Sequence, residues 1–228
     1  MTAGAMAALQ RIRARPPARA EASRCEFCAQ PLAERHEHVV EFSTGALSCS
    51  CIACALLFDR EGQPLRRVPR DSRYLLGFDL DPLEWASLMI PVKLAFITGK
   101  AGAGLGITGP RPRASPSGTR GAAALGPAPS MDIRYPSPGG IVTAPLDADL
   151  WISICSRHPE LQSLRPGLEA LLLNYMERPH QLFITPIDQC YRLAGLVRSA
   201  WSGFSGGSEV RRHVHNLCAE LRGGASRA

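Results

Sequence analysis

The chain has 228 residues, of which 45 % are apolar and 20 % are charged. These shares are normal for a soluble globular protein with a buried core. No stretch approaches the roughly 18 consecutive apolar residues of a membrane-spanning helix, so we expect no such span.

The net charge of +6 raises the question of a nucleic-acid partner. Residues 1–24 and residues 99–130 carry +4 each, so the rest of the chain carries −2. The excess of arginine and lysine therefore lies in the two segments least suited to fold. We expect no basic groove and no specific nucleic-acid partner.

Composition divides the chain into a few regions. The insert at 99–130 is rich in Gly, Pro, Ala and Ser, and such a composition buries too little apolar surface to offset its chain entropy. The expected regions are a disordered basic tail (1–24), a zinc-ribbon-like module (25–60), an α+β domain (61–222) interrupted by a flexible insert (99–130), and a frayed tail (223–228).

The elements of the first half follow from alternation and turn residues. Residues 37–42 and 45–51 predict two strands of a hairpin around Ser43-Thr44-Gly45. Asp81 predicts the N-cap of a short helix with Pro82 at its first position. Residues 92–97 predict a buried strand, with residues 132–137 as its antiparallel partner.

In the second half, Asp147 predicts the cap of a helix that ends at Arg157. Residues 180–187 predict a strand, whereas the pattern of 167–175 fits either a helix or a strand. Two further helices are expected, one capped by Asp188 and a last amphipathic one over 208–222. The predicted fold class is α+β, with an N-terminal zinc-ribbon-like β-hairpin module before a small α+β domain.

The cysteine spacing carries the strongest functional signal. Cys25 and Cys28 form one CxxC pair, and Cys51 and Cys54 form a second pair after an intervening hairpin. Each CxxC turn directs two sulfurs inward, and two such turns offer four thiolates in a tetrahedron. We therefore predict a zinc site on these four cysteines, with the ion supplying folding energy to a module too small for a large core.

Other ligands and metals remain open. Cys49 lies two residues before Cys51 and is an alternative ligand, and His38 is a candidate ligand or a partner that orients a ligand. His36 is interpreted as a solvated residue at a strand edge. Four thiolates also hold iron or an iron–sulfur cluster. A redox dithiol is disfavoured, because a redox CxxC motif starts a helix in a βαβ unit and the sequence shows none.

Catalytic motifs are not evident, so the sequence favours a non-enzymatic role. We interpret His213, His215 and Cys218 as parts of the last helix, and Asp188 and Cys190 as a cap and a core side chain. The clustered thiols, without an export signal, favour the reducing cytoplasm.

Several segments together resemble a bacterial family of unknown function that is often encoded beside high-affinity nickel–iron uptake hydrogenases. They are "CEFCAQPL", "HEH", "CSCIACALLF", "RVPRDSRYL", "DPLEWASLMIPVKLAF", "YPSPGG", "PIDQCYRL" and "WSGFSGG". The likeness covers most of residues 25–222, and residues 99–130 depart from it.

The resemblance implies a setting in hydrogenase maturation, assembly or electron transfer, with hydrogenase subunits or maturation factors as partners. The leading hypothesis is a non-enzymatic, zinc-binding accessory protein in the cytoplasm. The alternative is a redox or electron-transfer protein in which the same thiolates hold iron or an iron–sulfur cluster.

Overall fold

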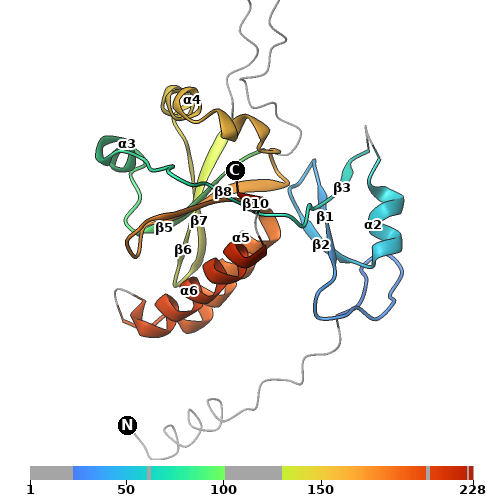
Figure 1. The fold of residues 1–228 in the computed structure, drawn as a ribbon. Coiled ribbons are helices and arrows are strands. Elements are labelled where there is room, and N and C mark those ends of the chain that lie inside the picture. The colour runs from blue at the N-terminus through green and yellow to red at the C-terminus, as the bar shows by residue number, and fades with distance from the viewer. Residues whose placement is uncertain (1–22, 61–62, 101–129, 204–205, 225, 228) are drawn as a thin grey trace, which may run out of the picture.

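The structure is a computed structural model that describes residues 23–60, 63–100, 130–203, 206–224 and 226–227 (Figure 1). It has the α+β class expected from the sequence and contains one sheet of three strands and one of seven. The expected disordered tail and flexible insert fall almost entirely outside the described residues.

The smaller sheet forms the N-terminal module and has the strand order β2-β1-β3. Its strands are β1 (Glu37–Glu41), β2 (Leu47–Ser50) and β3 (Leu65–Arg67). The β1–β2 hairpin is the predicted one, and the turn between its strands includes Gly45 at a φ of +71°. Because β1 is antiparallel to both neighbours, β2 and β3 run parallel to each other, and helix α2 (Ile52–Phe58) connects them. β3 lies beyond the boundary expected at residue 60.

The larger sheet has the order β10-β4-β9-β8-β5-β6-β7, and all its neighbours are antiparallel except β10 and β4. Its strands are β4 (Arg73–Tyr74), β5 (Leu94–Gly99), β6 (Met131–Ser137), β7 (Gly140–Pro145), β8 (Glu169–Asn174), β9 (Gln181–Pro186) and β10 (Ser226–Arg227). The predicted pairing of β5 with β6 is present. β10 pairs with β4 within the segment 223–228 that we expected to fray.

Helices cover both faces of this sheet, as Figure 1 shows. One face carries α3 (Pro82–Ser87), α4 (Ala148–Arg157) and the 3-10 helix η1 (Pro159–Ser163), and the other carries α5 (Ile187–Ala200) and α6 (Gly207–Gly224). In β8, Leu171 and Leu173 face the first layer, whereas Ala170 and Leu172 face the second. A strand buried on both sides reads as a continuous apolar run, which explains its ambiguous sequence pattern.

Helix starts follow the predicted caps at two positions. Asp81 accepts hydrogen bonds from the N–H groups of Leu83 and Glu84, and Asp147 accepts one from Leu150. The cap predicted at Asp188 is wrong, because α5 begins at Ile187 and no side chain caps it. Asp188 lies in the first turn of α5, where its carboxylate faces the module instead.

The module packs directly on the larger sheet. Val40 of β1 and Val68, which follows β3, are buried in the same apolar cluster as Leu193 of α5 and Val214 of α6. The two sheets therefore share one core through this cluster. Within the described ranges, none of the helices combines the length and the apolar character that crossing a bilayer requires.

Candidate metal centre

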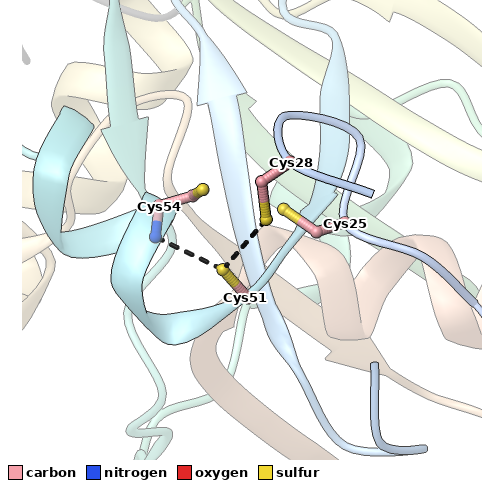
Figure 2. A group of neighbouring side chains, drawn as sticks. All are labelled: Cys25, Cys28, Cys51 and Cys54. Atoms are coloured by element: carbon pink, nitrogen blue, oxygen red, sulfur yellow. Dashed lines mark hydrogen bonds between the residues drawn. The ribbon is translucent and has the colours of Figure 1, made fainter. Parts of the chain in front are cut away.

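The first CxxC pair lies in a tight turn at the start of the module. The Cys25 N–H donates to the Gln30 carbonyl over 2.8 Å, and the Ala29 N–H donates to the Cys25 carbonyl over 2.8 Å. Ala29 has a φ of +60°, a conformation that glycine adopts more readily. This turn directs the sulfurs of Cys25 and Cys28 toward the same point (Figure 2).

The second pair lies where β2 ends and α2 begins. Cys51 is the N-cap of α2, and its Sγ accepts a hydrogen bond of 3.4 Å from the Cys54 N–H. Because this cap fixes the Cys51 side chain, its sulfur and that of Cys54 lie on the side that faces the first turn (Figure 2).

Two hydrogen bonds and one contact between aromatic rings hold the two turns together. The Glu26 N–H donates to the Cys49 carbonyl over 3.0 Å, and the Cys49 N–H donates to Glu26 Oε1 over 2.6 Å. The rings of Phe27 and Phe58 meet beside the turns, with their centroids 4.9 Å apart. The first CxxC turn is thus bonded to strand β2, which leads directly into the second CxxC pair.

The four sulfurs converge as the spacing predicts. The Sγ atoms of Cys25, Cys28, Cys51 and Cys54, here called the four-sulfur group, all lie within 4.8 Å of one another. The sulfurs of Cys28 and Cys51 are 3.7 Å apart. An ion in a tetrahedron with bonds of about 2.3 Å separates its sulfurs by about 3.8 Å. The group could therefore hold a metal ion after small adjustments.

The thiols of this group differ in acidity. Burial raises the pKa of Cys25, but hydrogen bonds from backbone N–H groups, led by that of Cys51, lower it to about 6. Desolvation and the neighbouring sulfurs raise the pKa of Cys54 to about 12. The Gln30 N–H lowers the pKa of Cys28, but the Cys25 sulfur and desolvation outweigh it, so that pKa is raised. The neighbouring sulfurs oppose ionisation of one another. All four can therefore be thiolates together only if a cation lies among them.

The group lies at the surface of the module. Cys25 and Cys51 are buried, whereas Cys54 is half-buried and Cys28 is exposed. The three cysteines that lie outside the module are buried in the core; they are Cys155, Cys190 and Cys218. Burial raises the pKa of Cys155 to about 12, as expected for an apolar core thiol.

Cys49 and His38, the further candidate ligands, lie in a separate cluster. They face each other across the β1–β2 pair, and His36 joins them so that one potential ligand atom of each lies within 4.8 Å of the others. Sequence reasoning treated His36 as a solvated residue and missed this cluster. The signal was available, because the turn at Ser43–Gly45 sets the register that pairs His38 with Cys49.

The structure overturns the expectation that disfavoured a redox dithiol. We expected no helix start and no βαβ unit at a CxxC motif, but α2 begins directly after Cys51 and connects the parallel strands β2 and β3. The motif was not recognised as a helix start because α2 is only seven residues long. An oxidised pair is therefore a relevant outcome of any experiment on these thiols.

The remaining candidates occupy ordinary structural positions. Cys218 is buried and accepts a hydrogen bond of 3.4 Å from Asn174 Nδ2. His215 lies at the surface with its Nδ1 3.6 Å from Glu177 Oε2. This agrees with their interpretation as helix residues.

A family model described as "Family of unknown function (DUF5947)" matches residues 24–125 and 124–225 of the chain. No curated protein and no solved structure matches the chain.

Proposed function

Because the chain belongs to a family of unknown function (DUF5947), we propose its role from the chemistry of its own residues: it binds one zinc ion in the four-sulfur group and acts as a non-enzymatic accessory protein. The observation that carries this proposal is the convergence of four cysteine sulfurs from two turns joined by a hairpin.

Zinc suits this arrangement for two reasons. It has no geometric preference of its own and binds four thiolates in a closed tetrahedron. The module also has a short sheet and one short helix, so a bound ion adds stability that its small core lacks. Structural zinc ions contribute about 10–16 kcal/mol in zinc-finger peptides.

A protein partner is supported by apolar side chains beside the centre. Ile52 and Leu56 lie one turn apart on α2 and are 52 % and 56 % exposed, while Ala55 faces the module and is buried. Neighbouring exposed apolar side chains are typical of interaction surfaces. The resemblance to a family encoded beside nickel–iron hydrogenases makes hydrogenase subunits or maturation factors in the cytoplasm our proposed partners.

An iron-binding redox protein is the second candidate. It is favoured by the exposure of Cys28, which places one residue of the group at the surface, where a redox partner could approach. Four thiolates also hold a single iron or an iron–sulfur cluster.

Elemental analysis of anaerobically purified full chain separates these candidates. We expect a colourless, zinc-containing protein, and Cys25→Ser and Cys54→Ser should each lose the zinc equivalent of the four-sulfur group. Cys155→Ala is the matched control, because its thiol lies in the core away from the group, and it should keep the zinc. A brown or red protein with iron would support the redox candidate. A metal-free chain with a Cys51–Cys54 disulfide would refute both.

A further inference from the structure

His36, His38 and Cys49, here called the second group, lie together on the module outside the four-sulfur group. His38 and Cys49 are direct partners in the β1–β2 register. His36 precedes β1, and its ring centroid is 4.7 Å from that of His38. The two histidine rings are therefore neighbours, although His36 lies outside the strand.

The contacts of His36 determine which nitrogen is available. Its Nδ1 lies 2.9 Å from the Ala33 carbonyl oxygen, which can only accept a hydrogen bond. Nδ1 therefore carries the proton, and Nε2 carries the lone pair. Nε2 is buried and has no hydrogen-bond partner in the part of the chain that the structure describes. A buried polar atom without a partner is costly, so this nitrogen indicates an absent ligand.

The Nδ1 atom of His38 also lies beside a hydrogen-bond acceptor, and here the acceptor is a carboxylate instead of a carbonyl oxygen. Its Nδ1 lies 3.0 Å from Asp188 Oδ2 on α5. Asp188 is itself held by Gln189, whose N–H and Nε2 donate to its two oxygens over 2.9 Å and 3.2 Å. A carboxylate on one ring nitrogen is the arrangement that orients metal-binding histidines and makes the other nitrogen more basic.

We propose that the second group is a further metal site, in which His36 Nε2, His38 Nε2 and Cys49 Sγ bind a divalent transition metal such as Zn²⁺. Two imidazoles and one thiolate suit zinc and its neighbours in the transition series. The three residues are half-buried. Three protein ligands leave a fourth coordination position for water or for a ligand from a partner. This site goes beyond the proposed function and does not depend on it.

The test counts metal ions on the full chain. Equilibrium dialysis of reduced protein against buffered free Zn²⁺ should give two equivalents for the wild type and one for the double variant His36→Ala/His38→Ala. The matched control is His213→Ala/His215→Ala, which removes two histidines of equal spacing from α6 and should keep both equivalents. Circular dichroism checks that each variant folds. His36→Gln/His38→Gln and Cys49→Ala replace the alanine variant if it does not.

Titration with Co²⁺ identifies the ligands of each equivalent. One equivalent of Co²⁺ should show the absorption typical of four sulfur ligands. The other should show the absorption of mixed nitrogen and sulfur ligands, and the histidine variants should lose this second absorption. Asp188→Asn should keep the stoichiometry and weaken binding of the second equivalent about 10–100-fold, as changes to the partners of metal-bound histidines do.

The outcomes separate this inference from the proposed function. A wild-type chain that saturates at one equivalent, retained in the histidine variants and lost in Cys25→Ser, overturns the second site and leaves the four-sulfur proposal intact. A single equivalent that disappears in the histidine variants and survives Cys25→Ser overturns the four-sulfur proposal and supports the second site. A double histidine variant that still binds two equivalents also overturns the second site.

Discussion

Glu26 and Cys49 form a reciprocal pair of hydrogen bonds that joins the first cysteine turn to the edge of β2. The Glu26 N–H donates to the Cys49 carbonyl, and the Cys49 N–H donates to Glu26 Oε1 at 2.6 Å. Only the second of these contacts depends on the side chain, so substitution of Glu26 isolates its contribution.

We expect Glu26→Ala to release zinc faster without preventing its binding. The variant loses a charge-assisted hydrogen bond at an exposed position. We value this bond at about 1 kcal/mol, below the range of about 1.5–3 kcal/mol for hydrogen bonds to charged groups, because water competes for both partners. The measurement is the rate of zinc transfer to a chromogenic chelator. Glu34→Ala, an exposed glutamate in the same segment, is the control. Equal release rates in both variants would show that the contact does not hold the turns together.

Ala29→Gly should stabilise the metal-bound module. Ala29 has a φ of +60°, and this left-handed conformation costs a residue other than glycine about 1–2 kcal/mol. Glycine removes that cost but loses about 0.4–1 kcal/mol through its freer unfolded chain. The expected net gain is below about 1.5 kcal/mol and is read from the thermal unfolding of the zinc-bound protein. A lower unfolding temperature would contradict it.

Zinc binding should release protons, and its affinity should rise with pH. In the metal-free protein the pKa of Cys54 is about 12 and that of Cys25 is about 6. At pH 7.5 Cys54 is therefore a thiol that must lose its proton to bind zinc, whereas Cys25 is already a thiolate. Below about pH 6, Cys25 becomes protonated as well, so affinity falls more steeply.

This pH dependence is measured by competition with a zinc chelator between pH 5.5 and pH 8. Proton release is recorded separately with a pH indicator in weakly buffered solution. An affinity that does not change over this range would mean that the metal-free thiols are already ionised.

The exposed apolar side chains of α2 should contribute to partner binding. Ile52→Glu and Leu56→Glu place charges on the surface beside the centre. If hydrogenase subunits are the partners, as we propose, both variants should weaken their capture by the tagged full chain. Zinc content and unfolding temperature should stay unchanged, since both side chains are exposed. Leu83→Glu is the control, because Leu83 is 79 % exposed on the distant helix α3. Equal loss of capture in all three variants would argue against a specific surface on α2.

The four-sulfur group could be predicted from the sequence because its geometry is local. Each CxxC pair forms one turn, and the hairpin between the pairs is marked by alternating residues and by a glycine with a φ of +71°. The pairing of His38 with Cys49 follows from the same hairpin, but it is recognised only when residues are compared across the strands.

The contact of Asp188 with His38 lay beyond sequence reasoning. It depends on how α5 packs against the module, which is set by the shared apolar cluster around Val40 and Leu193. An aspartate near a helix start has the residue type of a cap, so local rules assigned it there. Strand β8 was ambiguous for a related reason, because its burial on both faces depends on helices distant in the chain.

Strand β2 contributes to both sulfur-containing groups. Cys49 faces His38 across the hairpin, and Cys51, which directly follows the strand, belongs to the four-sulfur group. If the Ser43–Gly45 turn gained one residue, β2 would slide by one position and its side chains would change faces. Surface turns usually tolerate changes in length, but here such an insertion would misalign two sets of donor atoms at once. The length of this short loop is therefore constrained by donor atoms that belong to residues outside the loop.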